Sequence, residues 1–97
     1  MNLGQLSAAV KSYVESLDIK PDYADAHNNL GNALMELGRL DASVKSCQKA
    51  LSIKPDFADA HFNLGITFQK LKQLDKALES YESAIALNTN IDFILGI

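Results

Sequence analysis

The sequence predicts an all-α protein built from repeated pairs of helices. Two consecutive blocks of 34 residues, 21–54 and 55–88, are identical at 14 positions without a gap. Within each block, apolar residues recur at steps of three and four, the spacing that lines one face of an α-helix. A proline and an aspartate open both blocks, and proline ends a preceding helix. These three observations indicate a single domain, residues 1–97, in which each block contributes two helices.

Residues 3–20 are expected to form a helix that lacks its partner in the same repeat. Apolar side chains follow helical steps along it, at Leu3, Leu6, Val10, Tyr13 and Leu17. A shift by one repeat period places Gly4 on Gly38. We therefore interpret residues 4–20 as the second helix of a partial repeat.

The first helix of each full repeat is expected at residues 21–37 and 55–71. The opening proline suits the first helical turn, and the aspartate after it favours a helix N-terminus through its charge and side-chain oxygen. Gly38 stands just after the first of these helices, where a left-handed backbone favours glycine. Its counterpart is Lys72, so we expect this lysine to adopt the left-handed conformation or the second turn to differ.

The second helix of each repeat is expected at residues 40–53 and 74–87, with an aspartate in its first turn. The apolar positions are Leu40, Val44, Cys47 and Leu51 in one helix and Leu74, Leu78, Tyr81 and Ile85 in the other. Ala50 and Ala84 lie among them. Such small side chains allow neighbouring helix axes to approach to roughly 8–10 Å.

The repeat pattern ends after Asn88. Thr89 stands where a third proline would fall, and residues 91–97 are too short and too apolar for a solvated helix. We expect residues 89–97 either to fold onto the last helix pair or to begin the next segment of a longer protein.

Composition argues against several classes of function. Hydrophobic residues make up 47% and charged residues 22% of the chain, as in ordered globular proteins. The net charge is −3 and no basic stripe is present, so we expect no nucleic acid partner. No run of about 18 apolar residues occurs and the start lacks a basic and an apolar signal region, so we expect no membrane partner and no secretion. Cys47 is the single cysteine and cannot form an internal disulfide, which favours a cytoplasmic location.

Candidate chemical groups are few. The sequence has no Gly-rich phosphate loop, no nucleophile with a base and no paired carboxylates in a cleft pattern, so we expect no enzymatic activity and no cofactor. His27 and His61 are candidate metal ligands, but their spacing equals the repeat period and no further ligands accompany them. Packing is the favoured role for both histidines. It is also favoured for Cys47, which lacks a neighbouring cation.

The repeats resemble those of the tetratricopeptide family, whose motif joins W-x2-L-G-x2-Y to A-x3-F, a later alanine and a closing proline. The resemblance covers residues 4–88. The matching positions are His27, Leu30, Gly31, Leu34, Ser43, Cys47, Ala50 and Pro55 in the first full repeat, and His61, Leu64, Gly65, Phe68, Ala77, Tyr81 and Ala84 in the second. Histidine replaces the leading aromatic residue in both repeats, but no departure breaks a helix. The resemblance implies a right-handed solenoid of about 2.5 repeats with five main helices.

In that family the first helices line the concave side of the superhelix, so the resemblance implies a peptide-binding groove there. Its residues are Asp25, Asn28, Asn29, Asn32, Met35 and Glu36 from the first repeat, and Asp59, Phe62, Asn63, Ile66, Gln69 and Lys70 from the second. The implied function is a scaffold that binds a protein or an extended peptide, as part of a larger protein.

The repeats are also similar to those that precede the catalytic region of O-GlcNAc transferases and their bacterial relatives. The shared motif is Pro-Asp-Tyr/Phe-Ala-Asp-Ala-His-x-Asn-Leu-Gly. Residues 90–96 are similar to the junction after the last repeat in the bacterial members. In those proteins a ladder of asparagines contacts the backbone of an extended peptide, because a carboxamide both donates and accepts hydrogen bonds. Asn29 and Asn63 take this place here; the alternative is that they cap turns or face water.

Such repeats have three further uses to compare with the sequence. The apolar faces of the helix at residues 3–17 and of the tail at residues 93–95 favour self-association, through stacked ends or an exchanged helix. A second alternative is a substrate-presenting arm of a glycosyltransferase. The clamp that grips the C-terminal carboxylate of heat-shock chaperones is disfavoured, because Asp25 and Asp59 stand where it needs cations.

Overall fold

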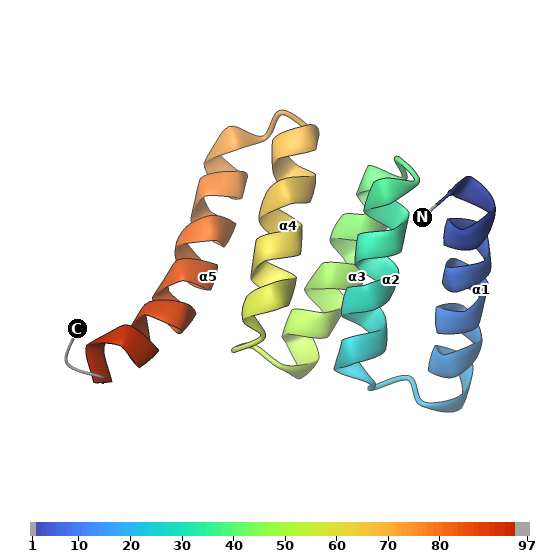
Figure 1. Cartoon of the computed structure of the whole chain (residues 1–97), viewed down its shortest axis with the longest axis horizontal. Helices are drawn as coiled ribbons and strands as arrows, with labels where there is room; N and C mark the ends of the chain where they lie inside the picture. Colours follow the sequence, from blue (N-terminus) through green and yellow to red (C-terminus); the bar gives the residue numbers. More distant parts are fainter. Residues whose placement is uncertain (1, 95–97) are drawn as a thin grey trace.

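The computed structural model describes residues 2–94, with the side chains of residues 2–88, and contains five α-helices and no strand within that range. The helices are α1 (Leu3–Ile19), α2 (Ala24–Glu36), α3 (Leu40–Ile53), α4 (Ala58–Lys70) and α5 (Leu74–Ile94). Each helix runs antiparallel to the one before it, and the five stand side by side in chain order (Figure 1). The predicted all-α solenoid of helix pairs is therefore confirmed.

The helices form two layers. Each helix packs against its neighbours in the chain, and α2 also contacts α4. Among the described residues, α3 contacts neither α1 nor α5, although all three are second helices of a repeat. The first helices are therefore closer together than the second helices, which makes the α2 and α4 side the inner side of the stack.

The first helices begin three residues later than predicted. Pro21 and Asp22 form a turn, closed by a bond of 3.3 Å from the Tyr23 N–H to the Lys20 carbonyl, before α2 begins at Ala24. The same turn precedes α4, and in both loops a lysine ammonium lies about 5 Å from the ring of the residue before the helix. The prediction that the prolines lie in the first helical turn is wrong: both lie in the turn before the helix, where their carbonyls accept hydrogen bonds from histidine side chains.

The turns that join the two helices of each repeat are alike. Gly38 and Lys72 both have a positive φ, +81° and +64°. The Arg39 N–H bonds the Leu34 carbonyl and the Gln73 N–H bonds the Phe68 carbonyl, each at 2.9 Å. This pattern closes a helix with one left-handed residue. Lys72 thus adopts the left-handed conformation, the first of the two options that its position allowed.

Helix α5 is longer than predicted. It was expected to end at residue 87, but it continues through residue 94. The physical reason is the absence of a third proline: Thr89 and Asn90 keep their backbone N–H groups and do not interrupt the helical hydrogen bonds. The expectation that the helix ends at residue 87 is therefore wrong, and residues 95–97 lie outside the described range.

The core lies around α4, which packs against α3 on one side and α5 on the other. Cys47, Leu64, Phe68 and Ala77 form its buried centre, and half-buried apolar residues pack around them, namely Val44, Leu51, Leu71 and Tyr81. Glycines in the first helices allow this contact: a Cβ atom on Gly65 would lie 2.8 Å from two ring carbons of Tyr81. Close packing at this point therefore depends on the missing side chain.

Candidate functional site

The predicted groove residues lie on α2 and α4, but they differ in exposure. Seven of these side chains face solvent: Asp25, Asn29, Asn32, Asp59, Phe62, Gln69 and Lys70. Glu36, the twelfth residue of the pattern, is exposed as well. Met35, Asn63 and Ile66 are half-buried, and Asn28 is buried. The inner side of the stack thus carries an open surface, here called the α2–α4 face, with one buried carboxamide at its centre.

The two repeats are joined across this face by their asparagines. The Asn63 Nδ2 group donates a hydrogen bond of 2.9 Å to the Oδ1 atom of Asn28. Asn28 is only 7% exposed. The sequence suggested an equivalent pair, Asn29 and Asn63, because they match in register. The structure instead pairs Asn63 with Asn28, one position earlier in the repeat.

Asn29 has different neighbours. It lies with Asn32 at a small cavity of about 70 Å³ between α1 and α2, which is also lined by Leu6 and Tyr13. Asn29 and Asn63 both lie inside helices, so neither caps a turn. Asn63 faces the first helix of the preceding repeat, whereas Asn29 faces α1, a second helix. The duplicated asparagines are therefore not equivalent in the folded chain.

An aromatic cluster borders the α2–α4 face on the α5 side. The Phe62 and Tyr81 ring centroids are 5.7 Å apart, with the rings tilted by 54°. The Tyr81 hydroxyl donates a hydrogen bond of 2.7 Å to the Oε1 atom of Gln69. Phe62 remains 51% exposed. Sequence reasoning placed Tyr81 in the core only; its hydroxyl reaches the face because α5 crosses α4 at Gly65.

Charge on the face is mainly negative. Asp25 and Asp59 lie in the first turns of α2 and α4, where the partial positive charge of the helix N-terminus stabilises carboxylates. Glu36 adds a third exposed carboxylate, against one exposed ammonium group on Lys70. The exposed charges of the face therefore sum to a net negative charge.

A buried polar network lies directly beneath the face. The Ser43 hydroxyl donates to the Gly31 carbonyl at 2.7 Å, and the Thr67 hydroxyl donates to the Asn63 carbonyl at 2.9 Å. The two hydroxyl oxygens are 3.1 Å apart, and both residues are fully buried. The sequence shows Ser43 only as a position of the repeat motif; its link to Thr67 depends on the packing of α3 against α4.

The two histidines have the same structural role. The His27 and His61 Nε2 atoms lie 2.8 and 3.0 Å from the carbonyls of Pro21 and Pro55. A carbonyl only accepts, so each Nε2 carries the proton and donates. Each ring thus holds the turn before its own helix, in agreement with the packing role predicted for them. Within residues 2–94 no group of three or more potential metal ligands is present.

Cys47 is a buried core residue. Its sulfur lies against Gly31, where an added Cβ would be 2.7 Å from it. Burial raises the pKa of the Cys47 thiol from 9.0 to about 11, and a hydrogen bond with the Ser43 side chain opposes this rise. The thiol is therefore protonated at neutral pH and a poor nucleophile.

The raised thiol pKa predicts a specific pH dependence of stability. The unfolded chain loses the thiol proton near pH 9.0 and the native chain near pH 11. Between these values the native state binds more protons, so the free energy of unfolding should fall, by up to about 3 kcal/mol. Urea unfolding of wild type and Cys47→Ala across this range measures the difference in slope. Equal slopes, or rapid labelling of the native thiol, would contradict the buried assignment.

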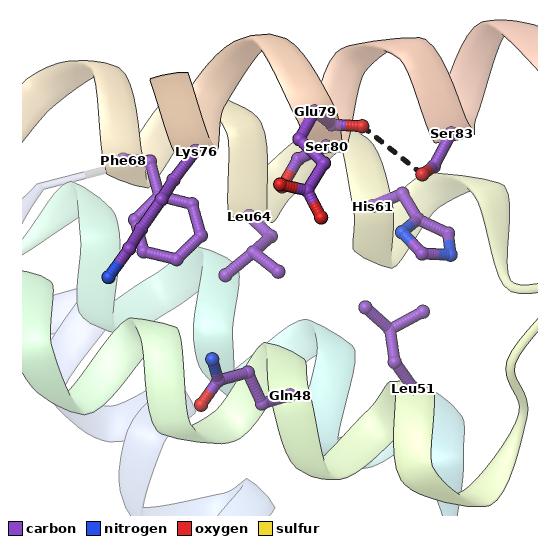
Figure 2. A pocket seen from close by; sticks show the side chains of 9 residues that line it. All are labelled: Gln48, Leu51, His61, Leu64, Phe68, Lys76, Glu79, Ser80 and Ser83. Carbon is purple, nitrogen blue, oxygen red and sulfur yellow. Dashed lines mark hydrogen bonds between the residues drawn. The ribbon is translucent and has the colours of Figure 1, made fainter. Parts of the chain in front are cut away.

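A second cavity lies on the opposite side of α4. It has a volume of about 320 Å³, and α4 lies between the walls formed by α3 and α5 (Figure 2). Leu64 and Phe68 in its lining are buried, Leu51 is half-buried, and the exposed residues Gln48, Lys76 and Glu79 also line it. The cavity follows from the lack of contact between α3 and α5.

In the described part of the chain, no helix combines the length and the apolar character that a membrane crossing requires.

Helix pairs of this length, the glycine contacts and the antiparallel stack define a helical repeat protein. Family models agree: a TPR repeat model matches residues 1–38 and 31–72, and a tetratricopeptide repeat model matches residues 58–90. The chain therefore belongs to the tetratricopeptide repeat family.

Solved structures show the same fold. A crystal structure of MamA superimposes with a TM-score of 0.84 at 24% identity, over 91% of this chain and 52% of MamA. The first TPR of Spaghetti (RPAP3), bound to the HSP90 peptide SRMEEVD, superimposes with a TM-score of 0.87 at 22% identity, over 90% of this chain and 69% of that one. This chain thus spans about half the length of MamA. No curated protein matches the sequence significantly.

Proposed function

We propose that the chain is a protein-binding scaffold that holds an extended peptide against the α2–α4 face. The observation that carries the proposal is the composition of this face: exposed Phe62 stands beside the bridged carboxamides of Asn28 and Asn63. An aromatic side chain supplies apolar contact area, and carboxamides bind main-chain groups of any sequence. The peptide complex of the similar RPAP3 domain supports this kind of ligand.

The ligand preferred by this face differs in charge from SRMEEVD, which has three acidic side chains and one basic one. Asp25, Glu36 and Asp59 are exposed on the α2–α4 face, with Lys70 as its exposed cation. Like charges at an interface disfavour binding. We therefore expect a neutral or basic peptide to bind more tightly than an acidic one.

The resemblance of the repeats to those of O-GlcNAc transferases extends the proposal. On that basis the same face would present a polypeptide substrate to a catalytic part of a longer protein. The support for this narrower function is the amino-acid sequence of the repeats, and the sequence of the complete gene product tests it directly.

The proposed peptide binding is tested by selecting short, end-blocked peptides from a random library and measuring their affinity by fluorescence anisotropy. Phe62→Ala should weaken binding by about 2 kcal/mol, roughly 30-fold, because a central aromatic residue often dominates such interfaces. Leu78→Ala is the matched control, since Leu78 is 60% exposed on α5, away from the face. Failure to select any peptide, or equal effects of the two variants, would argue against the proposal.

Self-association is a second candidate function, favoured by the outer surface of α5. Leu78 and Ile85 are 60% and 62% exposed. The equivalent residues of α3 are Val44 and Leu51, which pack against the core because α4 covers them. The same apolar surface is therefore covered on α3 and uncovered on α5. Burying each such side chain contributes about 1.5–3 kcal/mol, which favours the docking of another helix.

Self-association predicts a mass that rises with concentration in sedimentation equilibrium. Replacing Leu78 and Ile85 together by lysine should keep the chain monomeric, because association would then bury two unpaired charges. Phe62→Lys adds a charge on a different face and should associate as the wild type does. A wild-type chain that stays monomeric up to about 1 mM, where even weak contacts of about 4 kcal/mol form, would exclude this function.

A further inference from the structure

We propose that the uncovered apolar surface of α5 binds a basic amphipathic helix of a partner protein. This surface consists of Leu74, Leu78 and Ile85 and is here called the α5 surface. The inference rests on the helix docking proposed above for self-association, but it names a different occupant. The charges beside the α5 surface select a helix of opposite charge over a second copy of this chain.

The preceding repeat shows how such a surface is covered. The equivalent residues are Leu40, Val44 and Leu51 on α3, and Leu74, Leu78 and Ile85 on α5. The α3 residues are half-buried, whereas those of α5 are 60% to 64% exposed. Helix α4 covers α3 with large apolar residues at steps of four and three, namely Leu64, Phe68 and Leu71. A helix that covers α5 is therefore expected to carry apolar residues at the same spacing.

The chain after α5 does not supply this helix in the way that the chain after α3 does. Helix α3 ends at Ile53, a turn with Pro55 follows, and α4 begins at Ala58. One repeat period later, the equivalent of Ala58 is Asp92, which lies inside α5 itself. The last turns of α5 continue away from α4 instead of turning back (Figure 1). We therefore assign the covering helix to another molecule.

Charge distinguishes the α5 surface from its counterpart on α3. Three exposed residues border each surface, namely Asp41, Lys45 and Gln48 on α3, and Asp75, Glu79 and Glu82 on α5. On α3 these three residues line one cavity together with Val44 and with Phe68 and Leu71 of α4, so they lie beside the covering helix. One carboxylate and one ammonium group oppose each other there. The border on α5 has three carboxylates, which favour a basic helix.

The lysines near this border leave its middle negative. Lys72 belongs to the turn before α5, and the Lys76 ammonium group lies 5.7 Å from the ring centroid of Phe68 on α4. Both lysines lie toward the N-terminal end of α5, so Glu79 and Glu82 set the charge farther along the helix. A second copy of the chain carries a net charge of −3, and like charges disfavour its docking.

Two end-blocked peptides with the sequence of residues 57–71 serve as probes, because this segment contains the apolar residues that cover α3. The basic probe carries His61→Lys and Gly65→Lys, and the acidic probe carries His61→Glu and Gly65→Glu. His61 shares a cavity with Gln48, the counterpart of Glu82, so the changed side chains should meet the carboxylates of α5. Fluorescence anisotropy should show about tenfold or tighter binding of the basic probe. The difference should shrink at about 0.5 M salt.

Glu79→Lys combined with Glu82→Gln gives α5 the residues that α3 has. Both side chains are exposed, so the thermal midpoint should change little, but the preference for the basic probe should disappear. Glu36→Lys reverses an exposed charge on α2 and is the control, which should keep the preference. Leu78→Lys should weaken binding of both probes. Phe62→Ala should not, because Phe62 lies on the α2–α4 face.

The outcomes separate this inference from the proposed functions. A preference for the basic probe that Glu79→Lys with Glu82→Gln removes supports it; equal affinities, or a preference that the variant keeps, overturn it. If the probes bind equally while the chain self-associates through α5, the occupant is a second copy and only the docking role stands.

Two further outcomes also count against the partner helix. If residues 1–97 bind the basic probe but the complete gene product does not, a segment of the same chain covers the surface. If neither probe binds up to about 1 mM and the chain is monomeric, the α5 surface is not a docking site. Peptide binding on the α2–α4 face would be unaffected by that result, because Phe62→Ala tests it separately.

Discussion

Replacing Phe68 by alanine is expected to lower the free energy of unfolding by about 3–5 kcal/mol, whereas the same change at Phe62 should cost less than about 1 kcal/mol. Phe68 is 8% exposed and belongs to the core between α3, α4 and α5; Phe62 is 51% exposed on the same helix. Truncating the buried ring removes apolar contacts and leaves a cavity that rigid helices cannot close.

Urea unfolding followed by circular dichroism measures both values. The pair controls for residue type and for helix propensity, because both changes are Phe→Ala in α4. Since a chain of this size has limited stability, Phe68→Ala is expected to be largely unfolded at 37 °C. If the two variants lost equal free energy of unfolding, Phe68 would not be a residue of the core.

Replacing Gly65 by alanine is expected to destabilise the chain by about 1–3 kcal/mol, although alanine is the better helix former by about 1 kcal/mol. The added Cβ would lie 2.8 Å from the Cδ1 and Cε1 atoms of Tyr81. The Tyr81 ring has little freedom to move aside, because its hydroxyl bonds Gln69 and its ring contacts Phe62. Strain therefore outweighs helix propensity at this position.

Gly4→Ala is the control, for which no loss of stability is expected. The nearest atom to a Cβ there is the Asn2 Oδ1 at 3.4 Å, an ordinary contact, so this change in α1 should be neutral or stabilising. In a Tyr81→Ala background the penalty for Gly65→Ala should disappear, which a double-mutant cycle measures. A Gly65→Ala variant that is more stable than wild type would contradict the close approach of α5 to α4.

The two repeats differ in the contacts that they make on the α2–α4 face. The Phe62–Tyr81 pair and the bond from Asn63 both involve α4, which packs against the first helix α2 of the preceding repeat as well as against α3 and α5. At Asn29 the neighbouring helix is α1, and the cavity that Asn29 lines there is small. We therefore expect binding to concentrate around Asn63 and Phe62 rather than to be shared equally between the repeats.

Much of the fold follows from the sequence alone. The repeat period, the Pro-Asp pairs and the apolar steps predict five helices, their order and their pairing, because these features act through local backbone geometry and through one apolar face per helix. The small residues were also informative: Ala50 and Ala84 are buried at helix contacts. The two errors at helix ends have local causes, the turn formed by Pro21 and the absence of a proline at position 89.

The candidate site could be predicted only in part. Register alone places a set of polar side chains on the first helices, and most of them are exposed as expected. Register does not predict which asparagine side chains form a hydrogen bond, because identical residues in two repeats have identical neighbours in the sequence. The bond from Asn63 to Asn28 and the reach of Tyr81 to Gln69 depend on contacts between different helices.

For this protein the sequence by itself determined the family, the number of helices and the side of the stack that carries the polar face. Only the tertiary structure decided that Asn28 is the partner of Asn63, that Asn29 stands apart and that one apolar surface of α5 is uncovered. The physical reason is that helix formation depends on neighbours in the chain. Hydrogen bonding and burial of a side chain depend instead on which helix packs across from it, and that differs between the two repeats.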